Sequence, residues 1–173
     1  MTVVIRIASL ADAPQLQKLI NANAGQGLML PRSLHSLYEH VRDYVVAEDD
    51  GRIVGCVALH VAWEDLVEIR SLAVAEDAGG KGIGTLLVQA ALADARSLGA
   101  RRVFALTFVE PFFVGLGFHR VDKADLPHKI WQECVHCIHF PDCDEVALIL
   151  DLVPNEAADR ALPQSAGQAR RIA

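Results

Sequence analysis

The feature that most constrains the fold lies between residues 68 and 98, where a strand pattern, a glycine loop and a helix pattern follow one another directly. The loop is Gly79-Gly80-Lys81-Gly82-Ile83-Gly84, and because four of its six residues lack a Cβ, its backbone can approach a ligand closely. Apolar residues then recur at helical spacing, at Leu86, Leu87, Ala90, Ala91, Ala95 and Leu98. Since a helix N-terminus presents unpaired N–H groups and the positive end of its dipole, this arrangement predicts a cradle for an anion such as phosphate.

Two common nucleotide-binding motifs do not fit this loop. No Gly-Lys-Ser/Thr occurs at the spacing of a P-loop. The dinucleotide pattern Gly-x-Gly-x-x-Gly is not met either, because Gly80, Gly82 and Gly84 place the third glycine too early. A merely flexible loop before a helix is the alternative, since short glycine motifs also occur by chance.

Composition and charge narrow the class of ligand. With 173 residues, of which 52% are hydrophobic, the chain is long enough for one domain with its own core. The net charge of −6 provides no general basic field for nucleic acid or an anionic membrane, so an anionic ligand needs a local site, which favours a small molecule. The sequence shows no signal peptide, no apolar run of membrane-spanning length and no secreted disulfide framework, so we expect a cytoplasmic, reduced protein.

The pattern along the chain predicts a mixed α/β (α+β) domain with one central sheet. Expected strands are 3–7, 43–48, 53–61, 68–74, 102–107 and 145–152, with helices that contain Leu16 to Ile20, Leu34 to Val41, residues 86–98 and 111–116. Residues 21–26 are expected to end the first helix, and Ser33 to cap the second. The predicted order is β-α-α-β-β-β-α-β-α-β. We expect the domain to cover residues 1–152 and residues 153–173 to form a flexible tail.

The glycine loop resembles motif A of the GNAT superfamily of N-acetyltransferases, Gln/Arg-x-x-Gly-x-Gly/Ala. Gly82 and Gly84 match, but Gly79 stands where Gln or Arg is usual, which removes a side chain and leaves the amides in place. A later signature, Phe-Tyr-x-x-x-Gly-Phe, is matched from Phe112 to Phe118, with Phe113 in place of the tyrosine credited with protonating the leaving thiolate. Since a thiol pKa near 8.5 makes coenzyme A a good leaving group, this loss need not abolish activity.

The resemblance implies the GNAT fold, a central, mixed and largely antiparallel sheet that is splayed at the acetyl-CoA site, with helices on both faces. It implies acetyl-CoA as co-substrate, bound without a catalytic metal. The implied cofactor-binding residues are Leu72, Ala73, Val74, Gly79, Gly80, Lys81, Gly82, Ile83, Gly84 and Thr85.

Further segments resemble one branch of the superfamily, the short, kinase-lacking N-acetylglutamate synthases and related amino-acid N-acetyltransferases. They are residues 27–33, 54–60, 68–74 and 102–108. By this resemblance Leu30, Arg32, Arg70 and Ser71 would bind the acceptor, L-glutamate, at the first step of arginine biosynthesis. The expected partner is this amino-acid substrate, and the oligomeric state is open, with a homodimer as one option. An arginine suits a carboxylate because its fork binds both oxygens. The alternatives are another amine as acceptor, or an acyl-CoA-binding regulator without catalysis.

Glu68 is the expected general base. An α-amino group with a pKa near 8 is mostly protonated at neutral pH and must lose a proton before it attacks a thioester. The position of Glu68 before Leu72 resembles that of the glutamate base in histone acetyltransferases of this superfamily. Apolar neighbours should raise the Glu68 pKa toward the working pH. The alternative is a structural ion pair with Arg70 or Arg101.

A second group of residues has metal-ligating chemistry. Cys134, Cys137, His139 and Cys143 could complete a tetrahedral zinc site, but half of a zinc ribbon is missing and the spacing is tight, so packing cysteines are the favoured alternative. Cys56 is expected to be a small core residue, and His60 a satisfied core or edge histidine.

Overall fold

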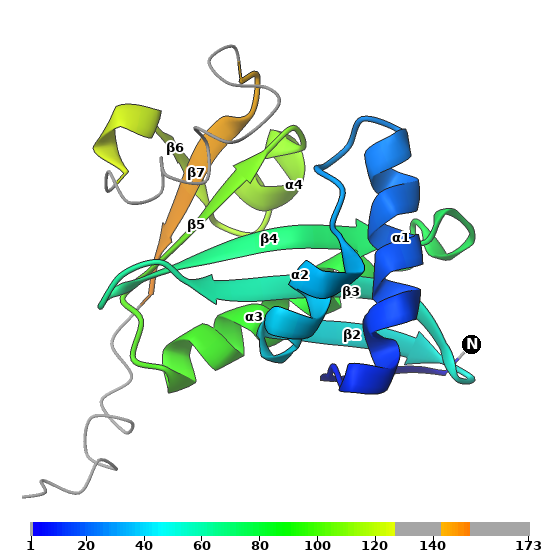
Figure 1. The fold of residues 1–173 in the computed structure, drawn as a ribbon. Helices are drawn as coiled ribbons and strands as arrows, with labels where there is room; N and C mark the ends of the chain where they lie inside the picture. The colour runs from blue at the N-terminus through cyan, green and yellow to red at the C-terminus, as the bar shows by residue number, and fades with distance from the viewer. Residues whose placement is uncertain (1, 127–142, 153–173) are drawn as a thin grey trace, which may run out of the picture.

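The computed structural model describes residues 2–126 and 143–152, which form one seven-stranded sheet with helices on both faces (Figure 1). The strands are β1 (Val3–Ile7), β2 (Tyr44–Asp49), β3 (Arg52–Val61), β4 (Leu66–Val74), β5 (Arg102–Thr107), β6 (His119–Val121) and β7 (Val146–Asp151). The helices are α1 (Ala13–Gly25), α2 (Leu34–Glu39), α3 (Ile83–Ser97) and α4 (Glu110–Val114), with short 3-10 helices η1 (Leu10–Asp12), η2 (Val41–Asp43), η3 (Glu76–Ala78) and η4 (Lys123–Asp125). The strand order is β1-β2-β3-β4-β5-β7-β6. The expected α/β class and GNAT-type sheet are confirmed.

The sheet opens between its two central strands. All neighbouring strands are antiparallel except β4 and β5, which run parallel and pair only at 66–68 with 102–104. Beyond Glu68, β4 continues to Val74 and β5 continues to Thr107 without pairing with each other, so their carboxyl ends diverge (Figure 1). The splay expected from the resemblance is therefore present.

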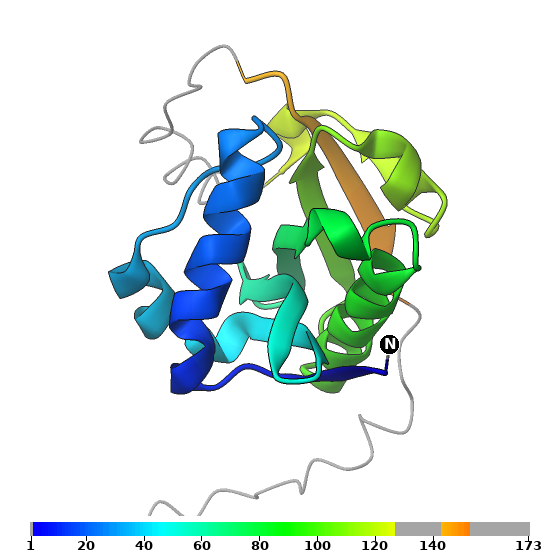
Figure 2. The same ribbon diagram turned by 90° about the vertical axis from the view of Figure 1, so that its right-hand side faces the viewer.

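The two faces of the sheet carry different helices. Helices α1 and α3 lie on opposite sides of it (Figure 2), and α2 packs beside α1. A Cβ on Gly55 would lie 2.9 Å from Leu87 Cδ1, so this side of β3 faces α3. Because side chains alternate along a strand, Ala58 and His60 face the other way, toward α1 and α2.

Three local expectations differ from the structure. Helix α1 does not end at residue 21 but continues to Gly25, since Asn23 turns its amide back to Leu19 O at 2.9 Å and leaves the helical backbone intact. Val41 lies in η2 rather than in the second helix, while the Ser33 cap is confirmed by a hydrogen bond from Ser36 N. Residues 119–121, for which no strand was expected, pair with β7.

The apolar face of α3 also differs in detail from the pattern read in the sequence. Leu86 and Leu98 are exposed, whereas the helix buries Ile83, Leu87, Val88, Ala91, Leu92 and Ala95. The helix is turned on its axis relative to expectation because Ile83 and Leu87 fill the space left by Gly55.

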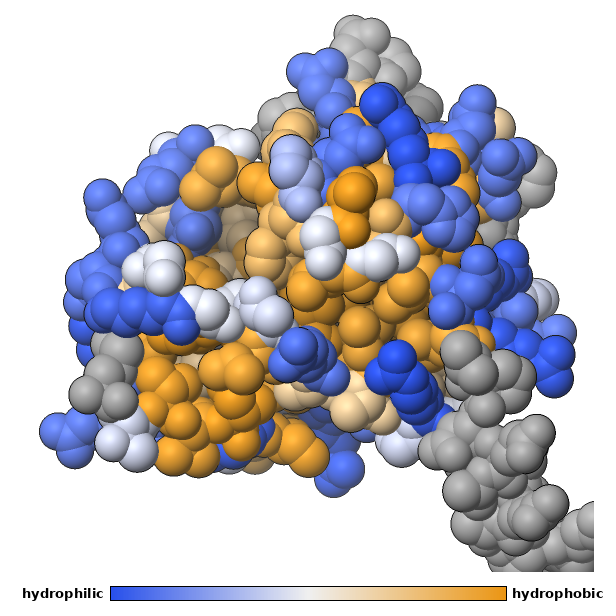
Figure 3. All heavy atoms as spheres, turned by 180° about the vertical axis from the view of Figure 1, so that it is seen from behind, coloured by the Kyte–Doolittle hydropathy of each residue, from blue (hydrophilic) through white to orange (hydrophobic). Residues whose placement is uncertain are grey.

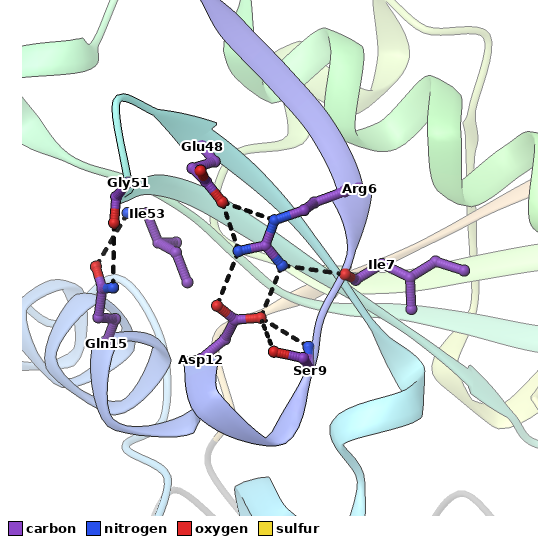
Figure 4. Close-up of polar contacts among 8 residues, drawn as sticks. All are labelled: Arg6, Ile7, Ser9, Asp12, Gln15, Glu48, Gly51 and Ile53. Carbon is purple, nitrogen blue, oxygen red and sulfur yellow. Dashed lines mark hydrogen bonds and ion pairs between the residues drawn. The ribbon is translucent and has the colours of Figure 1, made fainter.

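A partly buried ion pair fixes the start of the chain to the sheet (Figure 4). The Arg6 guanidinium donates to both Asp12 oxygens, at 2.7 and 2.9 Å, and to Glu48 Oε2 at 2.7 Å. Asp12 also accepts from Ser9 N–H at 2.7 Å, and it is only 5% exposed. The hydrogen bonds from Arg6 hold the pKa of the Asp12 carboxyl well below its usual range, although burial opposes this.

Replacing Asp12 by asparagine is expected to lower the free energy of unfolding by about 2 kcal/mol at pH 7, because it removes charge-assisted hydrogen bonds in a buried setting. Since the folded-state pKa is lowered, this stabilisation is present above the unfolded-state pKa near 3.9 and is lost as the pH falls below it. Urea unfolding of wild type and Asp12→Asn at pH 7 and at pH 3 measures the difference, which should shrink at the lower pH. Asp77→Asn, in an exposed pair with Arg52, is the control and should leave stability unchanged. A gap between wild type and Asp12→Asn that is as large at pH 3 would contradict this assignment.

Candidate active site

The divergence of β4 and β5 leaves one stretch of backbone without a neighbouring strand. On the side of β4 that faces β5, residues 69–74 pair with no strand among those in the described part of the chain. In the space-filling view from behind, a hollow opens at the upper left, on the side where β4 and β5 separate (Figure 3). The expected cofactor residues Leu72, Ala73 and Val74 lie along this free edge.

The glycine loop lies directly after that edge and leads into α3. Gly80 and Gly82 have positive φ angles of 71° and 77°, and a Cβ at either position would meet nothing within 4 Å. Gly82 is the N-cap of α3, so the first helical N–H groups, from Ile83 on, have no partner within the helix and point into the loop. The loop therefore has the open space and the donors that an anion cradle needs.

Two other loop residues are held by the protein itself. The Lys81 ammonium donates to Asp77 O at 2.9 Å, so its expected role toward the cofactor competes with a contact inside the loop. Gly84 lies in the first turn of α3, where a Cβ would come within 3.5 Å of the Phe112 ring. This is ordinary van der Waals distance, so Gly84 marks where α3 contacts Phe112 of α4 beside the cradle.

Alanine at Gly82 is expected to weaken acetyl-CoA binding about tenfold, because a left-handed backbone costs an L-residue about 1–2 kcal/mol and the loop would relax away from this conformation. Isothermal titration with acetyl-CoA measures the effect. Gly99→Ala is the matched control, since Gly99 has a φ of 79°, equally open surroundings and a position at the other end of α3. Both variants should lose similar stability, and equal losses of acetyl-CoA affinity in the two would contradict the cradle.

A bulge interrupts β4 between the candidate base and the free edge. The register shifts from Ala58 opposite Arg70 to Cys56 opposite Ala73, and Ser71 adopts a φ of 54°. The Tyr44 hydroxyl lies 3.4 Å from Ser71 Oγ, and the Cys56 thiol lies 3.4 Å from Ser71 O. These contacts hold a strained residue in place, as is common where a strand changes direction beside a site.

Glu68 and Arg70 project from β4 toward α1 and α2. The two face the same way because they stand opposite His60 and Ala58 of β3. Arg70 Nη1 lies 3.9 Å from Glu68 Oε2, and the two side chains are 11% and 16% exposed, respectively. This distance exceeds that of a charge-assisted hydrogen bond, so the Arg70 guanidinium attracts the Glu68 carboxylate electrostatically at this contact. Arg101, the other partner considered, is exposed and donates its backbone N–H to Asp65 O.

Arg32 is held near this site from the connection between α1 and α2. Its backbone N–H donates to Asn21 Oδ1 at 2.9 Å, and its carbonyl accepts from Asn21 Nδ2 at 3.2 Å. Its side-chain Nε is buried and has no hydrogen-bond partner among the residues that the structure describes. A buried guanidinium N–H without an acceptor costs free energy, so the position suits an anion supplied from outside the chain. Leu30, two residues earlier, is partly buried.

The Tyr44 phenol connects the two arginines. Tyr44 is 3% exposed, and burial raises its pKa, while the hydrogen bond with Ser71 and the charges of Arg32 and Arg70 act in the opposite direction. Of the expected acceptor residues, Ser71 contacts the Tyr44 hydroxyl directly, and the charges of Arg32 and Arg70 both act on the Tyr44 pKa.

Asn21 and Tyr44 were missed by the sequence analysis. Asn21 lies where the first helix was expected to end. Its side chain contacts the backbone of Arg32, 11 residues away, which no local sequence pattern predicts. Tyr44 begins a strand and looks like an ordinary core residue. The match to Phe-Tyr-x-x-x-Gly-Phe drew attention to Phe113, which is 3% exposed and packs edge-on against Phe112 and Phe118.

The cysteines and histidines give a mixed outcome. Cys134, Cys137 and His139 lie outside the described residues; Cys143 is described, and its carbonyl accepts from Lys123 Nζ at 2.8 Å. Within residues 2–126 and 143–152 no group of three His, Cys, Asp or Glu residues could hold a metal ion. Cys56 is fully buried, as expected, and burial raises the pKa of its thiol to about 12.

No helix in the described ranges has the length and apolarity needed to cross a membrane.

Comparison with protein families decides which group of proteins this arrangement belongs to. The model of the acetyltransferase (GNAT) family matches residues 15–120, which include most of α1, the splayed strands and the glycine loop. The chain belongs to the GNAT acetyltransferase family. It is an acyltransferase, and the resemblance seen in the sequence is confirmed.

Relatives in this family cover most of the chain. An uncharacterised N-acetyltransferase of Chlorobaculum tepidum is 41% identical over 148 residues, which are 86% of this chain and 96% of that protein. An amino-acid acetyltransferase of Mycobacterium tuberculosis is 40% identical over 133 residues, 75% of this chain and 76% of the relative. In a longer amino-acid acetyltransferase of Pasteurella multocida, 34% identical, the match spans 72% of this chain and only 29% of that protein.

Solved structures agree with this grouping. A Mycobacterium tuberculosis protein in complex with CoA shares a TM-score of 0.75 and 34% identity, over 87% of this chain and 99% of that one. N-acetylglutamate synthase from Neisseria gonorrhoeae, complexed with coenzyme A and N-acetyl-glutamate, gives a TM-score of 0.81 and 30% identity, over 88% of this chain and 36% of the synthase chain.

Proposed function

We propose that this GNAT enzyme transfers the acetyl group of acetyl-CoA to the α-amino group of L-glutamate. The observation that carries the proposal is the buried Nε of Arg32, which has no hydrogen-bond partner among the described residues; a second arginine, Arg70, lies beside Glu68 on β4. Glutamate has two carboxylates, and two arginines can neutralise both. The names of the relatives, amino-acid acetyltransferase and N-acetylglutamate synthase, support an amino acid as acceptor and glutamate in particular.

The residues of the loop fit the donor. We assign the pyrophosphate to the amides of residues 79–85 and the pantetheine arm to the free edge at Leu72, Ala73 and Val74, since these are the unpaired backbone groups beside the splay. Acetyl-CoA supplies an activated acetyl thioester. The backbone groups of the edge orient it, and no side chain of the chain needs to become acylated.

Glu68 takes the proton that the acceptor must lose. The α-ammonium group becomes a nucleophile only after deprotonation, and Glu68 is the carboxylate that lies on the acceptor side, next to the opening of the sheet. Arg32 and Arg70 hold the acceptor while Glu68 removes this proton. Direct attack within a complex of both substrates then needs only that the two be held together.

The test is coenzyme A release by the purified protein with acetyl-CoA and one amine at a time: L-glutamate, L-glutamine, L-aspartate, a polyamine or a short peptide. We expect release that depends on L-glutamate, with a lower KM than for the other amines. Faster release with another amine would replace glutamate as the acceptor while keeping the enzyme class. No release with any amine, together with a melting temperature raised by acetyl-CoA, would favour a CoA-binding regulator.

A further inference from the structure

A histidine–aspartate pair, His60 and Asp43, lies beside Glu68. His60 of β3 stands directly opposite Glu68 of β4 in the antiparallel register, and both side chains point toward α1 and α2. Cβ atoms of such cross-strand partners are about 4.5–5.5 Å apart, so their side chains are neighbours. The imidazole is thus a group next to the candidate base that can accept a proton at neutral pH.

Asp43 fixes the orientation and the tautomer of this imidazole. Asp43 Oδ2, from η2, lies 3.0 Å from His60 Nδ1. A carboxylate only accepts hydrogen bonds, so in the neutral ring Nδ1 carries the hydrogen and Nε2 keeps the lone pair. The His40 ring packs edge-on against His60, with centroids 5.9 Å apart, and its own Nδ1 lies 2.9 Å from Ser36 O. The His60 ring is therefore held on two sides.

Exposure increases from Glu68 toward His60. The Glu68 side chain is 16% exposed, whereas those of His60 and Asp43 are 30% and 26% exposed. The ionisable groups around His60 are Asp43 of η2, His40 at the end of α2, and Glu68 and Arg70 of β4.

We propose that His60, held by Asp43, relays to solvent the proton that Glu68 removes from the acceptor amine. This inference rests on the function proposed above. The ammonium group gives one proton to Glu68, the Glu68 carboxyl passes it to His60 Nε2, and the imidazolium releases it to water. A second proton leaves the nitrogen with amide formation and stays on the coenzyme A thiol, so each turnover releases one proton. His60 acts through Glu68 and is a positioning residue rather than a catalytic one.

The first test is His60→Gln, because glutamine can still donate to Asp43 but cannot carry a proton onward. We expect kcat to fall roughly 10- to 100-fold, less than the 10²–10⁴-fold typical of a group that acts on the substrate itself, with KM for both substrates unchanged. Added imidazole should restore part of the rate by replacing the missing base. His35→Gln, an exposed histidine of α2 paired with Glu39, is the control and should show neither the loss nor the stimulation. An unchanged kcat, or a loss that imidazole does not restore, would overturn the relay.

The second test does not depend on turnover. Nitrogen-15 spectra of the histidine side chains should show His60 as the Nδ1–H tautomer, and Asp43→Ala, which removes the acceptor, should abolish that preference. The His60 signals should also shift in Glu68→Gln and stay in place in Glu64→Gln. An Nε2–H tautomer, or signals indifferent to Glu68, would overturn the relay alone. Absence of coenzyme A release from wild type with every amine would instead overturn the proposed function and the relay together.

Discussion

Glu68→Gln is expected to lower kcat/KM for the acceptor by about 10²–10⁴-fold, the range typical of losing a general base. Glutamine keeps the size of the side chain and can still face Arg70 at the 3.9 Å distance seen here, so the fold and the acetyl-CoA site should be retained. Steady-state coenzyme A release at saturating acetyl-CoA measures the loss. Titration calorimetry should give the same acetyl-CoA affinity for the variant and for wild type.

The pH dependence separates a base from a structural ion pair. In wild type, kcat/KM should fall at acidic pH as Glu68 becomes protonated, and the midpoint measures the Glu68 pKa, whose rise stays a prediction. Glu68→Gln should lose this acidic limb. Glu64→Gln, an exposed residue at the turn before β4, is the matched control and should retain both rate and profile. If Glu68→Gln keeps a wild-type rate and loses only stability, Glu68 serves the ion pair with Arg70.

Arg32→Ala is expected to raise KM for glutamate by roughly 30- to 1000-fold, since truncating one partner of a buried charged pair costs about 2–4 kcal/mol. The same change should not lower the stability of the free protein, because it removes a buried donor that has no acceptor among the described residues. A raised KM for glutamate without a loss of stability would identify Arg32 as a residue whose side chain binds an anionic ligand rather than stabilising the fold. Thermal unfolding without ligand and KM measurement with glutamate test the two halves separately.

Replacing Asn21 should give a smaller effect on the KM for glutamate than replacing Arg32. Asn21→Ala leaves the Arg32 side chain in place but removes both hydrogen bonds to its backbone, so KM for glutamate should rise by less than in Arg32→Ala. Asn23→Ala is the matched control on the same helix, because the Asn23 side chain donates to Leu19 O within α1. An unchanged KM in Arg32→Ala would show that the acceptor carboxylates bind elsewhere and would remove the main support for glutamate.

The sequence by itself determined the elements that depend on neighbouring residues. The glycine loop, the start of α3 and the Ser33 cap depend on backbone freedom and on hydrogen bonds within a few residues, so each is visible as a local pattern. The succession of helices and strands along the chain followed from the same kind of pattern, except for the short strand at 119–121. The family also follows from the sequence, because its glycine motif is a short local pattern.

Predictions from local sequence patterns were wrong where a contact between residues far apart in the chain, or the packing of the core, decided the local structure. The asparagines of α1 suggested a break, but Asn21 is occupied by the Arg32 backbone and Asn23 by its own helix, so the helix continues. Leu86 fitted the apolar stripe of α3, yet the space beside Gly55 selects Ile83 and Leu87 for the core. Packing decided both cases.

The proposed acceptor site depends on the tertiary structure alone. The register between β3 and β4 brings Glu68 next to His60, and the Asn21 side chain fixes the backbone of Arg32, 11 positions away in the chain. Residue types and spacing do not determine which side chains face each other across a sheet. These neighbours are fixed only when the strands pair, when the bulge at Ser71 sets the register, and when β4 diverges from β5 and opens the space between them.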